Sequence, residues 1–241
     1  MAEKQGAALV TGGAVRVGRV IAEALADAGY DIALHYHHSA KEAAETAEAI
    51  CARGRKCTLF KADLGNSLEH KELMEKTFRE FPECNLLVNN ASIFERAEFM
   101  ATDEDSFDRH LAINFKAPFF LTQYFAERTE KGQVINILDT YITKTTGAYF
   151  AYLLSKKSLA EFTRMAARAL APHIRVNGIC PGTLLTSSTY PTQAGLEAAA
   201  KVLPLQRQPS LMDFTRALLF LITTPSITGE CLFVDSGQQL L

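Results

Sequence analysis

Short, continuously apolar runs alternate along this chain with longer segments in which apolar residues recur at helical spacing. The runs are rich in aliphatic and β-branched residues and are bounded by polar or turn-forming positions, which is typical of strands covered on both faces. Strands are therefore predicted at residues 6–11, 30–36, 56–62, 84–90, 133–139, 173–179 and 231–235. Helices are predicted at residues 16–28, 39–53, 67–81, 103–128, 149–171 and 211–222.

Strand–helix alternation with short connections predicts an α/β chain folded as a doubly wound Rossmann fold, with a mostly parallel seven-stranded sheet and helices on both faces. No repeat, low-complexity tract or linker-like stretch interrupts the pattern, so we expect one domain over residues 1–241. Ser39, followed three residues later by Glu42, has the spacing of a capping box at the start of one helix. Residues 183–204 carry the weakest core signal and are interpreted either as a mobile flap over a site or as a surface insertion.

Composition narrows the class of protein. The 241 residues carry 25 Lys and Arg against 27 Asp and Glu, a net charge of −2 that gives no broad attraction for nucleic acid or an anionic membrane. The five cysteines are odd in number and form no C-x-x-C pair, which argues against a disulfide framework or a zinc ribbon and favours a reducing, cytoplasmic setting. The apolar stretches near the two ends are too short for a signal peptide or a membrane span. A small-molecule substrate is the expected partner.

A glycine turn follows the first predicted strand, at the edge where a parallel sheet binds its ligand. Gly12 permits the tight turn, Gly18 lets the next helix approach the sheet, and the N–H groups that begin this helix suit a pyrophosphate. Arg16 stands where such turns often have a further glycine. A solvated arginine is one interpretation. Because a cation is unfavourable at a helix N-terminus, we favour an arginine that binds a phosphate or reaches the substrate.

The residues after the second predicted strand discriminate between coenzymes. An NAD site places a carboxylate there to bind the ribose hydroxyls, whereas residues 32–41 contain no Asp or Glu. Because a carboxylate would repel a 2′-phosphate, its absence favours NADP(H), with His37, His38, Ser39 and Arg16 as the phosphate contacts. Ser39 is alternatively a simple helix cap. The histidines lack a fourth ligand at suitable spacing, so no metal site is expected.

Two further strand ends lie at the same predicted crevice. Asp63 is positioned either to accept a hydrogen bond from an adenine amino group or to cap its own loop. Asn90, Ala91 and Ser92 follow the next strand, and their small side chains would let a coenzyme lie flat against the backbone. The crevice is therefore expected to hold a dinucleotide.

A tyrosine and a lysine share one face of the predicted helix 149–171. Tyr152 and Lys156 are four residues apart, which makes the phenol and the ammonium neighbours. A nearby cation lowers the pKa of a phenol and suits it to act as a general acid in hydride reduction. Asp139, at the end of the fifth strand, would act in the opposite sense, opposing ionisation of Tyr152 and keeping a proton available. A structural or helix-capping aspartate is the alternative interpretation of Asp139.

Five motifs follow one another along essentially the whole chain. They are T-G-x(5)-G at residues 11–18, N-N-A-S at 89–92, Asn114, Y-x-x-x-K at 152–156 and R-V-N-G-x-x-P-G at 175–182. In order and spacing, these motifs resemble those of the short-chain dehydrogenase/reductase family. The resemblance implies that Tyr152 donates the proton, that Lys156 binds the nicotinamide ribose and tunes the phenol, and that Asn114 holds a proton-relay water. It also implies a homotetramer, and coenzyme contacts from Val17, Leu64, Pro181 and Gly182.

Two departures from the common family pattern make the chain similar to the pteridine reductase branch. Asp139 replaces the usual catalytic serine, and Arg16 replaces the middle glycine of the turn. In that branch the aromatic residue of N-A-S-x-F, here Phe94, stacks on the pterin opposite the nicotinamide. Tyr149, Arg16 and Ser92 match pterin or coenzyme contacts of the branch. The alternative for Phe94 is a core aromatic that anchors its loop.

The resemblance and the chemistry together predict an NADPH-dependent reductase of dihydropterins or dihydrofolate. A ring C=N would accept hydride from the nicotinamide and a proton through Tyr152 and Asp139. A carboxylate is a hydrogen-bond acceptor, so it suits a substrate with N–H groups, such as a 2-amino-4-oxopteridine. One alternative is an NADP(H)-dependent carbonyl or alcohol oxidoreductase acting on a sugar, 3-oxoacyl or steroid-like substrate. Another is a non-enzymatic nucleotide-sensing or scaffold protein, against which the intact Tyr152, Lys156 and Asn114 argue.

Overall fold

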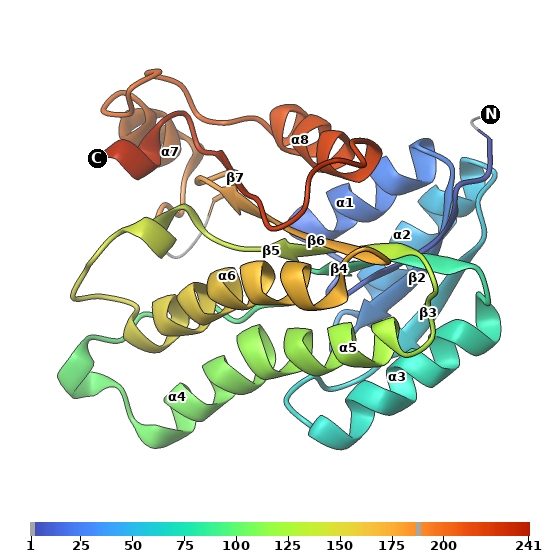
Figure 1. The fold of residues 1–241 in the computed structure, drawn as a ribbon. Helices are drawn as coiled ribbons and strands as arrows, with labels where there is room; N and C mark the ends of the chain where they lie inside the picture. Colours follow the sequence, from blue (N-terminus) through green and yellow to red (C-terminus); the bar gives the residue numbers. More distant parts are fainter. Residues whose placement is uncertain (1–2, 187–188) are drawn as a thin grey trace.

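Seven strands form one sheet in the computed structural model, which describes residues 3–186 and 189–241. The strand order is β3-β2-β1-β4-β5-β6-β7, and every neighbouring pair runs parallel (Figure 1). The strands are β1 (Gly6–Val10), β2 (Tyr30–Tyr36), β3 (Cys57–Lys61), β4 (Cys84–Asn89), β5 (Gly132–Ile137), β6 (Ile174–Pro181) and β7 (Cys231–Val234). The helices are α1 (Arg16–Asp27), α2 (Ala40–Ala52), α3 (Ser67–Glu80), α4 (Glu104–Leu111), α5 (Ala117–Ala126), α6 (Phe150–Leu170), α7 (Gln193–Ala200) and α8 (Leu211–Thr223). Shorter helical turns are η1 (Phe99–Ala101), η2 (Ala112–Lys116), η3 (Thr140–Thr143) and η4 (Gln238–Leu240).

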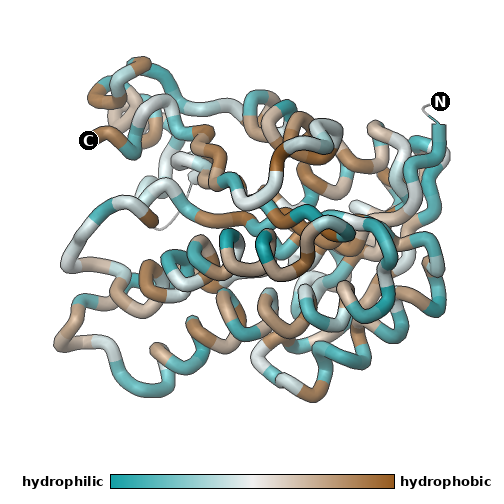
Figure 2. Tube along the Cα trace, viewed as in Figure 1, coloured by the Kyte–Doolittle hydropathy of each residue, from teal (hydrophilic) through white to brown (hydrophobic). Residues whose placement is uncertain are grey.

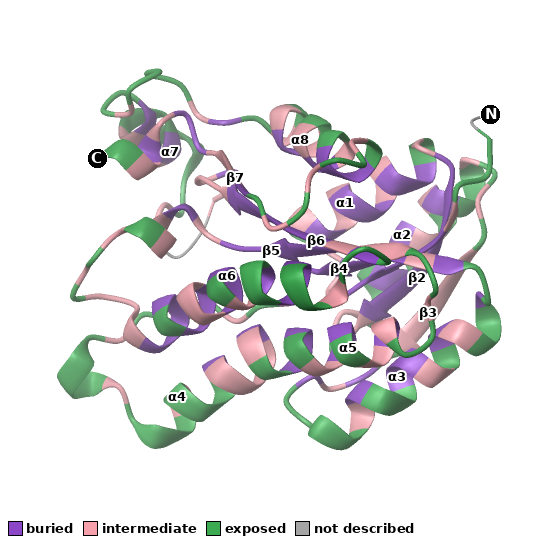
Figure 3. Ribbon diagram, viewed as in Figure 1, coloured by how far each residue is buried: buried purple, intermediate pink, exposed green. Residues whose placement is uncertain are grey.

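Helices cover both faces of the sheet, as predicted. α1, α2 and α8 lie on one face, and α3, α5 and α6 lie on the other (Figure 1). The central strands are buried along their length (Figure 3), and the helix traces alternate between apolar and polar residues (Figure 2). In β1, Ala8 and Val10 belong to one apolar core and Ala7 and Leu9 to the other, which explains the continuously apolar run. The doubly wound fold is therefore confirmed, with a sheet that is parallel throughout.

The predicted helix 103–128 is interrupted in its middle. α4 ends at Leu111, the π-helical turn η2 follows, and α5 continues from Ala117. Pro118, in the first turn of α5, has no N–H to donate to the carbonyl of Asn114 four residues earlier. Regular α-helical bonding therefore cannot run straight through this stretch, and Asn114 lies in the π-helical turn.

Two local expectations differ from the structure. Ser39 makes no side-chain capping hydrogen bond, and its backbone (φ −84°, ψ 59°) is not the extended conformation usual for an N-cap residue. The predicted capping box with Glu42 is therefore wrong. The segment 183–204 contains a helix that was not predicted, α7, while its residues 187–188 lie outside the described part of the chain. The mobile-flap interpretation of this segment stays a prediction.

Several global features bear on the function classes considered above. Across residues 3–186 and 189–241, no helix combines the length and the apolar character needed to cross a membrane. The five cysteines are free thiols, of which Cys51 is exposed. Within the described ranges, no group of three or more His, Cys, Asp or Glu side chains is arranged to hold a metal ion.

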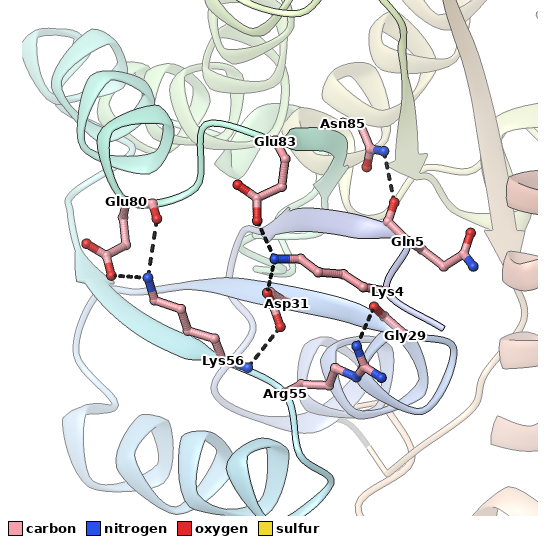
Figure 4. A network of polar contacts seen from close by, with 9 residues as sticks. All are labelled: Lys4, Gln5, Gly29, Asp31, Arg55, Lys56, Glu80, Glu83 and Asn85. Carbon is pink, nitrogen blue, oxygen red and sulfur yellow. Dashed lines mark hydrogen bonds and ion pairs between the residues drawn. The ribbon is translucent and has the colours of Figure 1, made fainter. Parts of the chain in front are cut away.

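A polar network ties together the amino-terminal ends of β1, β2, β3 and β4, opposite the edge where parallel sheets bind ligands (Figure 4). Asp31, 7% exposed at the start of β2, accepts hydrogen bonds at 2.9 Å from the Lys56 backbone N–H and from Lys4 Nζ. Lys4 Nζ also contacts Glu83 at 2.6 Å, and Lys56 Nζ contacts Glu80 at 2.7 Å. Asp31 is thus the buried member of an otherwise exposed group of charges.

Replacing Asp31 by alanine should lower the free energy of unfolding by about 1–3 kcal/mol, because the Lys56 N–H loses its acceptor and Lys4 loses its more buried partner. Urea denaturation would measure the loss. Glu83→Gln is the control, because it weakens only an exposed ion pair and should have a smaller effect. Equal losses in the two variants would contradict the central role of Asp31.

Candidate active site

An open cleft of about 660 Å³ lies beyond the carboxyl ends of the strands. Residues that follow β1 through β6 line it, as expected for the ligand site of an open parallel sheet. The predicted site residues on its walls are Gly12, Arg16, Val17, Gly18, His37, His38, Ser39, Asp63, Leu64, Asn90, Ala91, Ser92, Phe94, Asp139, Tyr149, Tyr152, Lys156, Pro181 and Gly182. Of the predicted site residues, all of which the structure describes, Asn114 alone does not line the cleft.

The glycine turn leaves no room for side chains where it meets β4 and α1. Gly12 has φ +60°, and a Cβ there would lie 3.0 Å from Ala91 Cα. A Cβ on Gly18 would lie 2.0 Å from the Gly12 carbonyl oxygen, so the helix start can approach the turn only with glycine. Asn90 Nδ2 donates to the carbonyls of Thr11 and Gly12 at 2.9 and 3.1 Å. Asn90 therefore holds the turn in place, in addition to lining the cleft.

Two cleft residues other than glycine have left-handed backbones. Arg16 has φ 53° and Tyr149 has φ 59°, conformations that cost about 1–3 kcal/mol for residues with a Cβ. Both side chains contact the segment that follows β6. Arg16 Nη2 donates to the Thr186 carbonyl at 2.6 Å, and the Tyr149 hydroxyl lies 2.6 Å from Thr189 Oγ1. Arg16 is thus engaged at the cleft rather than simply solvated.

The far end of the cleft contains the residues expected to bind the adenosine half of a coenzyme. The rings of His37 and His38 lie 3.6 Å apart, centroid to centroid, and Ser39 follows them with its hydroxyl not used as a cap. Asp63 Oδ1 accepts the Gly65 N–H at 2.8 Å. One carboxylate oxygen of Asp63 therefore caps its own loop, while the residue also lines the cleft.

The predicted chemical groups meet at the opposite end, between β5 and α6. The Tyr152 hydroxyl donates to Asp139 Oδ2 at 2.7 Å, while Asp139 Oδ1 accepts the Tyr141 N–H at 2.7 Å and so caps η3. Lys156 Nζ donates to the Ile137 carbonyl at 2.7 Å and lies 5.9 Å from the centre of the Tyr152 ring. Asp139 is therefore both a capping residue and the direct partner of the phenol.

Burial and the carboxylate determine the ionisation of this group. Burial, reinforced by Asp139, raises the pKa of Tyr152 well above its usual value, and burial also raises the pKa of the Asp139 carboxyl. Burial lowers the pKa of Lys156 to about 8. The prediction that Lys156 lowers the pKa of Tyr152 is therefore wrong, and the opposing effect predicted for Asp139 prevails. The pair Asp139–Tyr152 holds a proton at neutral pH.

Asn114 lies behind the cleft wall rather than on it. Its side-chain oxygen accepts the Ile93 N–H at 2.9 Å, and its Nδ2 donates to the Ile93 carbonyl at 3.0 Å and to Ser155 Oγ at 3.1 Å. These bonds use the buried amide to fix the loop between Ser92 and Phe94 and to tie it to α6. The water-holding role of Asn114 stays a prediction.

Aromatic rings form one wall of the cleft beside the chemical groups. Phe94 is 41% exposed, stacks on Tyr149 with centroids 4.5 Å apart and planes 10° apart, and meets Tyr152 edge-on at 4.7 Å. A core aromatic that anchors its loop would be buried, so that interpretation of Phe94 is wrong. The wall presents a flat apolar surface to a ligand.

His35 is a cleft residue that the sequence analysis does not single out. It lies in the apolar run of β2 and is buried, yet it lines the cleft. A polar ring at a buried strand position is a signal in itself, because buried polar groups require hydrogen-bond partners. The sequence does not show what those partners are, because the groups that bond to the His35 ring, in Gly12 and Ala62, lie 23 and 27 residues away.

Comparison with known proteins finds relatives along nearly the whole chain. A family model described as enoyl-(acyl carrier protein) reductase matches residues 13–239. Pteridine reductase 1 of Leishmania tarentolae is 31% identical, over 97% of this chain and 96% of its own length. 2-Dehydro-3-deoxy-D-gluconate 5-dehydrogenase of Dickeya dadantii is also 31% identical, over 95% of this chain and 94% of its own length.

Solved structures agree with these matches. FolM alternative dihydrofolate reductase 1 from Brucella canis, complexed with NADP, has a TM-score of 0.93 with this chain. The two are 36% identical, and the match covers 98% of this chain and 95% of that one. The predicted fold and family are both confirmed. The chain therefore belongs to the short-chain dehydrogenase/reductase family, with a pteridine reductase among its relatives.

Proposed function

We propose that the protein is an NADPH-dependent reductase of pterins that reduces a ring C=N of a dihydropterin or dihydrofolate. The observation that carries this proposal is the Asp139 carboxylate, hydrogen-bonded at 2.7 Å to the Tyr152 phenol. A ketone reductase needs a neutral donor at this place to bind the substrate oxygen, whereas a carboxylate accepts from the N–H groups of a pterin. The similarity to a pteridine reductase and to an alternative dihydrofolate reductase supports the same substrate class.

The cleft residues fit a dinucleotide that carries a 2′-phosphate. The turn at Gly12 and Gly18 admits no side chain, so α1 can begin close to it, and the N–H groups of the first turn of α1 would face a pyrophosphate. His37, His38 and Arg16 would hold the 2′-phosphate, and residues 32–41 contain no carboxylate that would repel it. When bound, the reduced nicotinamide supplies the hydride.

The chain supplies the proton that completes the reduction. The raised pKa of Tyr152 keeps the phenol protonated near neutral pH, so it can donate to the ring nitrogen while the adjacent carbon accepts hydride. As a carboxylate, Asp139 would orient the substrate by accepting hydrogen bonds from the N–H groups of the substrate. When Asp139 is protonated, it would return a proton to the Tyr152 phenolate. Lys156, held by the Ile137 carbonyl, would bind the nicotinamide ribose.

The second candidate is an NADP(H)-dependent carbonyl or alcohol oxidoreductase. The 31% identity to a sugar-acid dehydrogenase favours it, because that relative is as similar to the chain as the pteridine reductase. Asp139, which replaces a hydroxyl with a charged acceptor, argues against it.

Absorbance at 340 nm would test the two candidates in one panel. Purified protein should consume NADPH with dihydrobiopterin, dihydromonapterin or dihydrofolate, with a higher kcat/KM than for any sugar, 3-oxoacyl or steroid ketone. Activity confined to ketones would remove the pterin proposal. Tight NADPH binding without turnover on any of these compounds would instead favour the non-enzymatic alternative.

Phe94→Leu should raise KM for the pterin about fivefold, because the loss of ring stacking removes on the order of 1 kcal/mol of substrate binding. Affinity for NADPH should not change. Phe220→Leu is the control, since Phe220 is also an exposed phenylalanine but lies on α8, outside the cleft-lining residues. An unchanged pterin KM in Phe94→Leu would argue against ring stacking.

We further propose that the protein is a homotetramer. Phe119 on α5 and Leu154 and Met165 on α6 are exposed apolar side chains on helices that contact each other, and Met165 is 65% exposed. Such surface is commonly buried between subunits. Light scattering should give four times the chain mass of 26.5 kDa. A monomer would contradict the proposal.

A further inference from the structure

His35 has a buried polar side chain that takes no part in the proposed reduction. Its ring lines the cleft and is 2% exposed. Nδ1 lies 3.0 Å from the backbone nitrogen of Gly12, and Nε2 lies 3.1 Å from the carbonyl oxygen of Ala62. Because the Gly12 N–H can only donate and the Ala62 carbonyl can only accept, Nδ1 must be unprotonated and Nε2 must carry the hydrogen. The contacts therefore select one neutral tautomer of His35.

The two partners of the ring follow different strands. Gly12 lies in the turn after β1, whereas Ala62 follows β3 and directly precedes Asp63 and Leu64, which line the cleft. The backbone of His35 adds a third contact, because its carbonyl accepts the Gly13 N–H at 2.9 Å. The imidazole is thus a rigid spacer between the glycine turn and the loop after β3.

We propose that His35 is a positioning residue for the coenzyme, and that its neutral ring fixes the glycine turn against the loop after β3. This rests on the proposed function only in taking the ligand to be a dinucleotide. An aliphatic side chain, such as that of the preceding Leu34, would leave the Gly12 N–H and the Ala62 carbonyl without these partners in the interior. The glycine turn would then lose its fixed distance from the loop after β3.

The surroundings of the ring preserve the acceptor on Nδ1. Burial lowers the pKa of His35 to about 4, and the neighbouring His37 acts in the same direction. The Ala62 carbonyl and the carboxylates of Asp63 and Glu69 oppose this effect only in part. The ring therefore stays neutral near pH 7 and can accept from Gly12.

Three substitutions separate the two hydrogen bonds of the ring. His35→Asn places a carbonyl oxygen near the position of Nδ1, His35→Gln places an amide near Nε2, and His35→Leu has neither. Fluorescence titration with NADPH alone should give a Kd about tenfold or more above wild type for His35→Leu, with substantial rescue in His35→Asn and less in His35→Gln. KM for NADPH should follow Kd, whereas kcat at saturating NADPH should stay unchanged.

Thr77→Val is the matched control, because it removes a buried hydroxyl that donates to the Leu73 carbonyl at 2.8 Å within α3, outside the cleft-lining residues. It should lower stability without changing the Kd for NADPH. A wild-type Kd in His35→Leu, or no rescue in His35→Asn, would overturn the proposal.

Nitrogen NMR of the histidine-labelled wild-type protein keeps the proposal testable if His35→Leu fails to fold. Near neutral pH, the His35 ring should carry its hydrogen on Nε2, with and without NADPH. The opposite tautomer or a charged ring would overturn the positioning role. Wild-type protein that binds no NADPH would refute the proposed function instead, and a lack of pterin turnover would leave the NADPH titration intact.

Discussion

Tyr152→Phe should reduce kcat for pterin reduction by about 10²- to 10⁴-fold and leave NADPH binding nearly unchanged. The variant loses the phenol proton and the 2.7 Å hydrogen bond to Asp139, but it keeps the ring that packs edge-on against Phe94. Substrate positioning should therefore survive while proton donation is lost. Single-turnover absorbance at 340 nm with saturating NADPH would measure the chemical step.

Tyr124→Phe is the control for this variant. Tyr124 is a phenol on α5 that stacks on Phe120 and lies outside the cleft-lining residues, so its removal should leave kcat unchanged. If Tyr152→Phe turned over as fast as wild type, the proton would have to reach the substrate by a route that does not use the phenol.

Asp139→Ser should lower kcat/KM for pterins by about 100-fold or more and shift the preference of the protein toward ketones. The substitution removes a charged acceptor, worth about 1.5–3 kcal/mol for a hydrogen bond to a charged group, and also removes the proton store beside Tyr152. The ratio of kcat/KM for dihydrobiopterin to that for a ketone would measure the shift. The Kd for NADPH should change much less than turnover does.

Asp139→Asn separates the effect of charge from that of shape, because the oxygen of the asparagine amide can still accept the Tyr141 N–H and so cap η3. Turnover should fall in this variant too, since the charge is gone. Asp103→Asn is a matched control, because Asp103 likewise caps a helix by accepting the Ser106 N–H at 2.7 Å. Should Asp139→Ser reduce pterins at the wild-type rate, both the proton role and the substrate selection assigned to Asp139 would fail.

Much of the fold was predictable because its signals are local. A strand buried on both faces must be apolar at consecutive positions, so β1 is visible in the sequence without knowledge of its neighbours. The sequence signal of the glycine turn is also short, because Gly12 and Gly18 lie six positions apart and Gly18 is required by its contact with the Gly12 carbonyl, although the residue that excludes a side chain at Gly12 is the distant Ala91. The π-helical turn was missed because helical periodicity continues on both sides of Pro118.

The electrostatic balance of the site could not be predicted from spacing. Tyr152 and Lys156 are neighbours on α6, but Lys156 Nζ is held by the Ile137 carbonyl, 5.9 Å from the centre of the phenol ring. Burial raises the pKa of Tyr152 most, and Asp139, whose Oδ2 lies 2.7 Å from the phenol oxygen, raises it further. How close Asp139 and Lys156 each come to Tyr152 depends on tertiary packing. The partners of His35 were hidden for the same reason, because they lie 23 and 27 residues away in sequence.

A crystal structure of the ternary complex with NADP⁺ and a dihydropterin would test most directly the claim that Asp139 selects flat nitrogen heterocycles. The bicyclic ring should lie between Phe94 and the nicotinamide, with its N–H groups facing the Asp139 carboxylate and its reducible nitrogen within hydrogen-bond reach of Tyr152. A ring bound elsewhere in the cleft, or an Asp139 side chain turned away from the reactive carbon of the coenzyme, would contradict the claim.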